Sequence, residues 1–391
     1  MLGWILALAV SAVWGWVLYQ SYLGRSSLEQ LPGRVPGAER LPLVSVIVAA
    51  KEEQENIQDT IRYLHHQSYP HLEIIAINDR SNDTTGARLD AMKAWSDGRP
   101  AGGPTLRVIH IANLPEGWLG KNHALYQGYL QARGSYLLFT DADVRFEPHT
   151  IRDSMAYVLQ HQIDHLTLIP RLIARSFWLK SFVHFFMFCV FILFPPWAAN
   201  DDLRRTGGLG IGAFNLMKRE AYERIGTHRA FAMRPDDDLR LGMLVKQEGL
   251  RQRVVSGVGN IAVEWYTSLK QAIKGLEKNL YSGFQFRLSL ALLAVAGLLL
   301  LFAAPLTAVI WSRGFTLVLW LLAAGLLITD YVLVIRSVVK EDGREAVVLP
   351  ISVFVLLGVL VRSVWLAHRR RGVYWRGTFY PLAELKRKFR Q

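Results

Sequence analysis

Two carboxylates stand two residues apart, Asp141 and Asp143, directly after an apolar run that ends in Leu-Leu-Phe-Thr. Side chains at positions i and i+2 of a strand face the same side, so both can bind one divalent cation if the backbone stays extended past Phe139. Oxygen ligands favour Mg²⁺ or Mn²⁺. The alternative is a strand followed by an ordinary turn, in which Asp is common. The pair predicts a metal site if the surrounding fold supports it.

A second group of acids, Asp236, Asp237 and Asp238, opens a segment that ends at Gly249. Acidic side chains at the start of a helix are favoured by the positive end of its dipole, which is one explanation. Carboxylates close together also raise each other's pKa, which suits a general base working near neutral pH. Both explanations hold if one carboxylate points into a cleft and the others serve the helix.

The elements that must position these acids alternate between strand and helix. Strands are predicted over residues 43–50, 72–79, 106–111 and 136–140. The alternation predicts an α/β domain with a doubly wound, Rossmann-like, mostly parallel sheet, whose ligands bind beyond the carboxyl ends of the strands. Asp79 and Asp141 to Asp143 lie at such ends. No glycine-rich phosphate loop follows the first strand, so nicotinamide and ATP chemistry have no support.

Composition predicts a membrane protein with one sizeable soluble domain, because 51% of the 391 residues are hydrophobic and the mean hydropathy is +0.18. Four apolar stretches approach the roughly 20 residues that a helix needs to cross a bilayer. They cover residues 2–23, 286–311, 315–338 and 346–367. We therefore expect one amino-terminal anchor and about three carboxyl-terminal transmembrane helices.

A fifth apolar stretch, Phe177 to Trp197, is also long enough to span a membrane. A crossing there would place Asp79 and Asp238 on opposite sides. We therefore predict a helix lying in the membrane interface, and a buried core helix of the soluble domain is the alternative.

The charge and the cysteine content of the chain indicate which partners and which cellular compartment to expect. The net charge of +13 suits contact with anionic headgroups; nucleic acid, the alternative partner, lacks a basic helix or an aromatic RNA-binding motif. Arginines follow the first apolar stretch instead of preceding it, so we expect a multi-pass protein of the cell (inner) membrane with a cytoplasmic soluble domain. One cysteine excludes an intramolecular disulfide. The basic tail, 368–391, conflicts with three spans after that domain, and the span count stays open.

The order of the motifs resembles the family 2 glycosyltransferases with a GT-A fold, and within them the membrane-anchored branch that glycosylates lipids. The resemblance is carried by Val44 to Glu53, Asn78 to Asp83 and Thr140 to Asp143. The segment Gly117 to Gly128 is similar to one in carotenoid-acid (diaponeurosporenoate), ceramide and hopanoid-associated glycosyltransferases. The similarity runs from about residue 41 to 285.

The resemblance implies roles for individual residues. Asp143, with Asp141, matches the metal motif, and Asp238 matches the catalytic base, with Asp237 as the second choice. Donor-binding positions are Ala50, Glu53, Asp79, Lys121 and Asp141, and Asp79 points to a uridine nucleotide. Acceptor-side positions are Gly208, Gly212 and Lys278.

The sequence thus predicts inverting, metal-dependent transfer of a single sugar from a UDP-sugar to a membrane lipid such as a carotenoid, hopanoid or sphingolipid. The alternatives are a polyprenyl-phosphate glycosyltransferase that makes a lipid-linked sugar, and a catalytically silent membrane scaffold that binds sugar nucleotides. The predicted domains are an anchor (1–24), a GT-A domain (41–285, with the interfacial helix at 177–197), a transmembrane region (286–367) and the tail (368–391).

Overall fold

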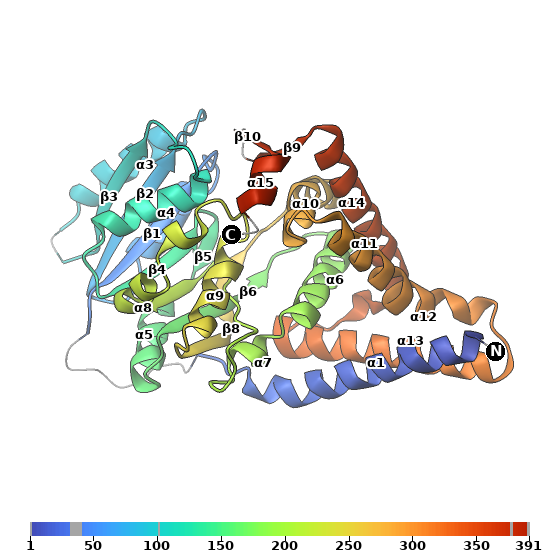
Figure 1. The fold of residues 1–391 in the computed structure, drawn as a ribbon. Coiled ribbons are helices and arrows are strands. Elements are labelled where there is room, and N and C mark those ends of the chain that lie inside the picture. The colour runs from blue at the N-terminus through green and yellow to red at the C-terminus, as the bar shows by residue number, and fades with distance from the viewer. Residues whose placement is uncertain (1, 32–40, 101, 376–377, 389–391) are drawn as a thin grey trace. The chain divides into compact units, whose positions relative to one another are not determined.

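The computed structural model describes residues 2–31, 41–100, 102–375 and 378–388, without the side chains of residues 2, 278, 279, 375 and 388. Contacts divide the chain into two compact units (Figure 1). The sheet unit comprises residues 28–173 and 196–264, and the helical unit comprises residues 1–27, 174–195 and 265–391. Parts of the predicted anchor and tail (residues 1, 376–377 and 389–391), and residues 32–40 between the anchor and the predicted GT-A domain, lie outside the described residues.

The sheet unit contains an eight-stranded sheet with the order β3-β2-β1-β4-β7-β6-β8-β5. Its strands are β1 (Val44–Ala50), β2 (Leu72–Asp79), β3 (Thr105–Ile111), β4 (Tyr136–Asp141), β5 (Val144–Phe146), β6 (His165–Leu172), β7 (Asn215–Lys218) and β8 (Gln252–Val263). The first four neighbours are parallel, β6 pairs in parallel with β8, and β7 and β5 run antiparallel to their partners. This mostly parallel sheet confirms the predicted fold class.

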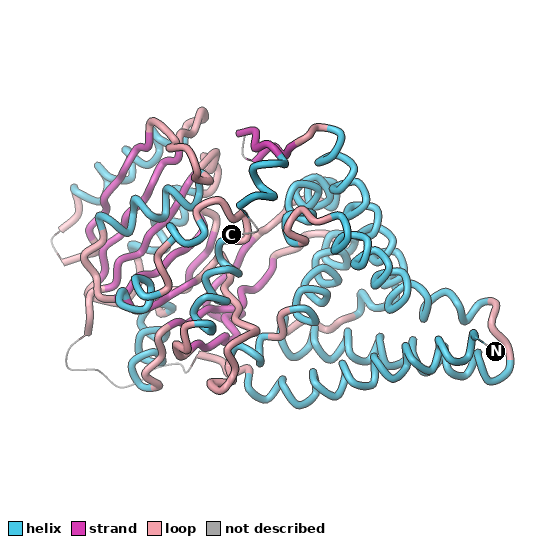
Figure 2. Tube along the Cα trace, viewed as in Figure 1, coloured by secondary structure: helices cyan, strands magenta, loops and turns pink. Residues whose placement is uncertain are grey.

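The predicted strands agree with β1 to β4 within one or two residues. Every residue of β1 and β2 is buried, which is typical of strands covered on both faces. The helices of this unit are α2 (Ile57–His65), α3 (Thr85–Asp97), α4 (Gly120–Gln131), α5 (Thr150–Gln160), α7 (Pro196–Ala199), α8 (Arg219–Arg224), η2 (His228–Phe231) and α9 (Asp237–Gln247). Figure 2 shows these helices in cyan against the magenta strands.

One hydrophobic core joins the elements that carry the candidate chemistry. It includes Leu125 of α4, Phe139 of β4 and Leu241 of α9, all at most 3% exposed. Leu125 lies one helical turn after Lys121, Phe139 two residues before Asp141, and Leu241 one turn after Asp237. Burying a side chain of this size stabilises a fold by roughly 1.5–3 kcal/mol, so the same packing that stabilises the sheet unit also fixes the polar residues beside it.

The helical unit is mostly apolar helix. Its elements are α1 (Leu2–Gly24), η1 (Arg25–Ser27), α6 (Phe177–Leu193), α10 (Leu269–Gly283), α11 (Leu288–Gly297), η3 (Leu298–Ala303), α12 (Ala304–Thr307), η4 (Ala308–Ile310), α13 (Gly314–Val334), η5 (Ile335–Val339), η6 (Arg344–Val348), α14 (Leu349–Arg369), β9 (Gly372–Trp375), β10 (Thr378–Pro381) and α15 (Leu382–Lys388). Helices α1 and α13 pack side by side (Figure 1). They run parallel, because Gly3 lies against Thr316, Ser11 donates to the Leu319 carbonyl, and Gly15 lies against Leu326.

Five helical segments of the described chain are long and apolar enough to cross a membrane. They are 3–27, 177–199, 288–310, 314–339 and 344–369. The second of them cannot make a single crossing, because it follows β6 and precedes β7 and β8, and these three strands belong to one sheet. Its helix, α6, packs on α14 and α10 within the helical unit.

Candidate active site

Lys121 lies among carboxylates that come from two other elements. Its Nζ is 2.8 Å from Oδ1 of Asp141 and 3.4 Å from Oδ2 of Asp237. Lys121 stands in the first turn of α4, Asp141 is the last residue of β4, and Asp237 is the first residue of α9. The structure therefore brings together residues that are up to 116 positions apart in sequence, counted from 237 minus 121. Three of the predicted site residues thus form one ionic cluster.

Asp238 joins this cluster through the backbone. Its Oδ2 accepts from the Gly212 amide at 2.7 Å, and its Oδ1 accepts from the Leu239 amide at 2.8 Å. A Cβ atom on Gly212 would lie 2.5 Å from Oδ2 of Asp141 and 3.3 Å from Oδ2 of Asp238. Only glycine leaves room for both carboxylates here. Gly212, predicted on the acceptor side, therefore lies between the two acids.

Asn122 fixes the loop that leads into α9. Its side-chain nitrogen is within hydrogen-bond distance of the Phe231, Ala232 and Arg234 carbonyl oxygens, at 3.0, 3.1 and 2.9 Å. The neighbouring Leu119 amide also donates to the Ala232 carbonyl. Asn122 is 1% exposed, so this amide has no solvent alternative. Two adjacent residues thus position the acids of α9. Lys121 pairs with Asp237 by charge, and Asn122 binds the backbone of the loop that precedes the helix.

Burial shifts the pKa values of the charged groups in the cluster. It raises the pKa of Asp237 to about 7, and the charges of Asp238 and Asp141 act in the same direction while Lys121 opposes them. Burial also raises the pKa of Asp238, with Asp141 adding to the effect. Burial lowers the pKa of Lys121, but the three surrounding carboxylates outweigh it and raise that pKa above the usual range. Lys121 is therefore charged at any physiological pH.

Two buried polar residues of this site were missed from sequence. His228 is 1% exposed and lies 2.6 Å from the Tyr222 hydroxyl through its Nδ1; burial, helped by the charge of Lys121, lowers its pKa to about 3, so the imidazole is neutral. Asn215, the first residue of β7, exchanges hydrogen bonds with the backbone of Ile211. Neither residue stands in a recognisable spacing. Only their tertiary position shows their role.

The side chains of the cluster leave a void of only about 10 Å³ between them, lined also by His228 and Asn215. That is room for about one water molecule. The exposed rim is formed by Asp141, whose side chain is 36% exposed, and by Lys121, at 24%, whereas that of Asp237 is 8% exposed. A substrate would therefore meet Asp141 and Lys121 first.

The predicted nucleotide-binding residues lie along the neighbouring strand ends. Asp79 ends β2 and is paired with Arg80 through two bonds of 2.7 and 3.1 Å. It faces the start of α4, since a Cβ on Gly120 would be 2.2 Å from its Oδ2. Ala50 ends β1, which pairs with both β2 and β4. The amide of Glu53 donates to the Thr85 hydroxyl at 2.8 Å. These residues share the edge of the sheet with Asp141 but are not part of its ionic cluster.

Two of the remaining predicted positions lie elsewhere. Gly208 is buried against α9, where its Cβ would lie 2.0 Å from the Gly242 carbonyl oxygen, so close backbone packing accounts for this glycine. Lys278 belongs to α10 in the helical unit, and its side chain lies outside the described part of the structure.

Asp143 follows β4 in a turn at residues 142–143, because the chain leaves β4 to enter β5. The extended backbone that the metal prediction assumed therefore ends at Asp141. Within the described residues, no group of three or more His, Cys, Asp or Glu side chains is placed to hold a metal. The candidate donors are carboxylate oxygens alone, half-exposed at the end of a strand. Such a set fits a hard divalent cation that takes its other ligands from water and phosphate.

Comparison with known families decides the relationship of this domain. Residues 45–226 match the model of the glycosyl transferase family 2. The chain carries a family 2 glycosyltransferase domain. The matched region of this domain includes Asp79, Lys121 and Asp141, and ends before Asp238.

Relatives place the family 2 domain more narrowly. It is similar to the 4,4'-diaponeurosporenoate glycosyltransferase of Staphylococcus aureus strain USA300, with 26% identity over 244 residues. That alignment covers 61% of this chain and 61% of the relative. The protein of strain NCTC 8325 matches with the same values. The chain is thus related to the carotenoid branch of the family, and the match spans less than two thirds of the relatives' length.

A solved structure supports the fold. The chain is similar to a mannosyltransferase from Pyrobaculum calidifontis, determined in complex with GDP-Man and Mn²⁺, with a TM-score of 0.57 and 18% identity. The likeness covers 93% of this chain and 99% of the other. The family 2 domain therefore has a GT-A-like fold.

Proposed function

We propose that this protein transfers one sugar from a UDP-sugar to a membrane lipid, with inversion at the anomeric carbon and with the help of a divalent cation. The observation that carries the proposal is the cluster of Lys121, Asp141, Asp237 and Asp238. It assembles at the carboxyl end of β4, where α/β folds bind their ligands, within a family 2 domain. The apolar helices of the same chain support a substrate that resides in a membrane.

Lys121 and Asp141 form the rim that a nucleotide sugar would contact. The lysine ammonium is a compact charge suited to a diphosphate, and Asp141 accepts from sugar or ribose hydroxyls. Asp143 and Asp141 would hold Mg²⁺ or Mn²⁺, which when bound neutralises charge on the departing nucleotide diphosphate. Ala50, Glu53 and Asp79 would bind the nucleoside at the neighbouring strand ends.

Asp238 is the proposed base, with Asp237 as the alternative. Two backbone amides hold the Asp238 carboxylate in place, which provides the orientation that proton transfer requires. Asp238 is also the more exposed of the two, whereas Asp237 is buried against Lys121. An acceptor hydroxyl or carboxyl group would therefore reach Asp238 more readily.

We propose that three helical segments cross the membrane: α1, the segment 288–310, and α13 with η5. The arginine after α1 favours, by the positive-inside rule, an amino end outside and a sheet unit in the cytoplasm. In this arrangement α1 crosses inward, the segment 288–310 crosses outward and α13 crosses inward again. Helices α1 and α13 would then run in the same direction, which agrees with their parallel packing. Helix α14 would lie in the interface, since Arg362 near its middle pairs with Glu277 of α10. The basic tail then stays on the cytoplasmic side, which removes the conflict between span count and charge.

The acceptor is proposed from the relative's name and from the apolar helices together. The related Staphylococcus aureus protein is named for glycosylating diaponeurosporenoate. In this chain, candidate acceptor-side positions are Gly208, Gly212 and Lys278. A lipid hydroxyl or carboxyl group is the expected acceptor.

The test is transfer by the full-length protein, purified in a neutral detergent. Radiolabelled UDP-glucose, UDP-galactose, UDP-N-acetylglucosamine and GDP-mannose are each incubated with Mn²⁺ and an apolar lipid extract, and the glycosylated product is identified by mass spectrometry. We expect one UDP-sugar to label a lipid. Exclusive use of GDP-mannose would refute the uridine assignment. A labelled polyprenyl phosphate would establish the lipid-linked donor reaction instead, and binding without transfer would establish a scaffold.

Asp143→Ala tests the metal proposal. We expect loss of UDP release with the thermal unfolding temperature within about 2 °C of the parent, because surface substitutions usually change stability little. Asp90→Ala on α3, an exposed acid paired with His110, is the matched control and should keep full activity. Undiminished turnover of Asp143→Ala in the presence of EDTA would exclude a metal at this position.

A further inference from the structure

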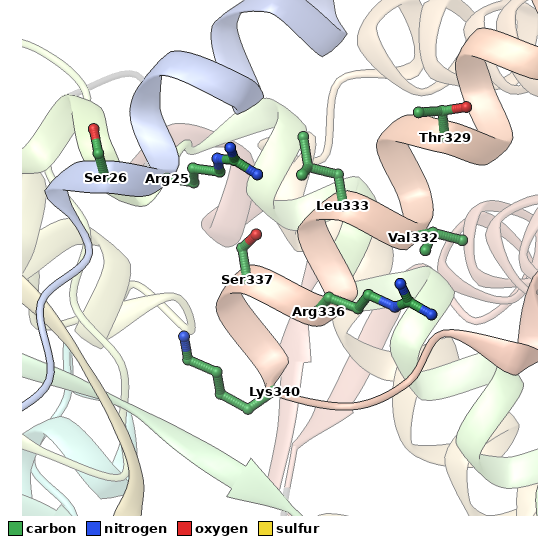
Figure 3. A pocket seen from close by; sticks show the side chains of 8 residues that line it. All are labelled: Arg25, Ser26, Thr329, Val332, Leu333, Arg336, Ser337 and Lys340. Carbon is green, nitrogen blue, oxygen red and sulfur yellow. The ribbon is translucent and has the colours of Figure 1, made fainter.

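A hollow of the helical unit lies between the end of α1 and the end of α13. It has a volume of about 660 Å³. The residues that line it are Arg25, Ser26, Thr329, Val332, Leu333, Arg336, Ser337 and Lys340. Figure 3 shows Arg25 and Ser26 on one side of this hollow, with Ser337 and Lys340 on the other. We call it the basic hollow, because three cations and three hydroxyl groups line it, and no acidic side chain of the described residues does.

The cations of the basic hollow lie near acids without forming direct ion pairs, and Asp342 is close enough for the charge of Arg336 to act on its carboxylate. Among the described residues, Arg25, Arg336 and Lys340 form no ion pair with a carboxylate; Arg25 stacks on Tyr22 at 4.1 Å, and Arg336 donates from Nε to the Asp342 carbonyl at 3.1 Å. The acids that follow α13 are engaged elsewhere: Glu341 pairs with Lys180 at 2.8 Å, and Asp342 with Arg344 at 2.9 Å. The lining of the hollow therefore has three cations and no acidic side chain of the described residues.

The basic hollow lies at the ends of two apolar helices, which is the level of the lipid headgroups if these helices cross a membrane. Helices α1 and α13 run parallel, and both apolar stretches end at this level, at Gly24 and Val339. Cations at the ends of membrane helices attract anionic headgroups. Val332 and Leu333 form an apolar wall next to the charged groups, which suits the glycerol and first methylene groups of a lipid.

We propose that the basic hollow binds the phosphate of an anionic membrane lipid, with Arg25 and Lys340 as its principal cations. Arginine and lysine donate strong, charge-assisted hydrogen bonds to phosphate oxygens, and Ser26 and Ser337 add neutral donors. The occupant is a structural lipid that joins α1 to α13, not the acceptor of the sugar. The inference does not depend on the proposed transferase activity.

The experiment uses the full-length protein in a neutral detergent and three probes. These are short-chain phosphatidylglycerol, short-chain phosphatidylcholine and inorganic phosphate, each titrated by isothermal calorimetry. We expect phosphatidylglycerol to bind, and phosphatidylcholine and millimolar phosphate to bind far more weakly. In Arg25→Gln/Lys340→Gln, the affinity for phosphatidylglycerol should fall about thirtyfold, from the loss of two surface charges.

Two further variants make the result decisive. Arg287→Gln/Arg313→Gln removes the same charge from exposed positions of the helical unit that do not line the hollow, and it should bind phosphatidylglycerol like the parent. Arg25→Lys keeps the charge and should retain binding, even if the double variant folds poorly. Equal loss in both double variants, or unchanged binding in the first, would overturn the proposal. Equal binding of inorganic phosphate would make the occupant a free anion instead of a lipid.

Discussion

The ionic cluster of the sheet unit and the basic hollow of the helical unit both contain charged side chains, but these charges are arranged in different ways. In the cluster, one lysine pairs with Asp141 and Asp237 and lies in the field of Asp238, and the void between the side chains is about 10 Å³. In the hollow, three cations face a space of about 660 Å³ without a carboxylate of the described residues in its lining. The first arrangement is closed and has one cation for three carboxylates, two of which have raised pKa values, whereas the second is positively charged and open.

The two regions differ in where their charges find partners of opposite sign. The cluster is buried beside the core of α4, β4 and α9, where unpaired charges are costly and must be paired within the protein. The hollow lies on exposed helix ends, where cations are hydrated and can await a partner. Charges that are paired within the protein, as in the cluster, predict large effects of single substitutions on activity. Cations that are paired by a bound lipid, as proposed for the hollow, predict effects on binding that depend on salt and on the lipid.

The largest effect should come from the proposed base in the cluster. Asp238→Asn removes the carboxylate and turns an amide group toward one of two backbone donors, so we expect turnover to fall about 10²- to 10⁴-fold. UDP release measures turnover, and calorimetry measures UDP affinity, which should change less than tenfold. Asp237→Asn is the comparison variant and should lose less activity. The reverse order of the two variants would assign the base to Asp237.

Lys121→Met should be the next most harmful change. It leaves Asp141, Asp237 and Asp238 without their cation and removes a charge from the donor rim, so we expect activity to fall about 10²- to 10³-fold. The matched control is Lys93→Met, which removes an exposed lysine paired with Asp97 on α3 and should act like the parent. Activity of Lys121→Met within threefold of the parent would show that the cluster is structural only.

Asn122→Ala tests the loop that positions the acids. It removes the side-chain donor from the carbonyl oxygens of Phe231, Ala232 and Arg234, of which Phe231 and Ala232 keep a backbone donor. The free energy of unfolding should fall by about 1–3 kcal/mol. The control is Gln127→Ala on the same helix, whose amide is hydrogen-bonded to His123. Urea unfolding measures both variants. If stability falls equally in both, the amide of Asn122 has no special role in holding the loop.

The smallest effect concerns salt and compares the two regions directly. Raising NaCl from about 0.05 to about 0.5 M shortens the screening length severalfold. Phosphatidylglycerol binding at the exposed hollow should weaken severalfold, whereas the difference in unfolding temperature between the parent and Lys121→Met should hold within about 2 °C, because buried pairs are screened little. If salt changed this difference in unfolding temperature but left phosphatidylglycerol binding unchanged, the cluster would not be the more shielded of the two regions.

Much of the sheet unit could be predicted because its pattern is local. The apolar runs of β1, β2 and β4 end in polar residues at the right places, and the acids of α9 stand at its first turn. The strands β6 to β8 were not predicted, and neither were His228, Asn215 and the loop role of Asn122. Strand β8 contains Gly257 and Gly259, which weaken a strand signal, and the three polar residues act only through partners distant in sequence.

The sequence by itself determined the class of fold, the apolar helices, and which residue types stand at the ends of the strands, because periodicity and composition are properties of neighbouring residues. It also supplied Lys121, Asp141 and the acids of α9 as candidates. Only the tertiary structure decided that these residues meet around one ammonium group, that Gly212 separates two carboxylates, and that the strands before and after α6 in the sequence belong to one sheet. Only the tertiary structure gathered Arg25 with Lys340. The physical reason is that electrostatic and steric contacts depend on distance in space, which burial of a shared core sets and sequence spacing does not.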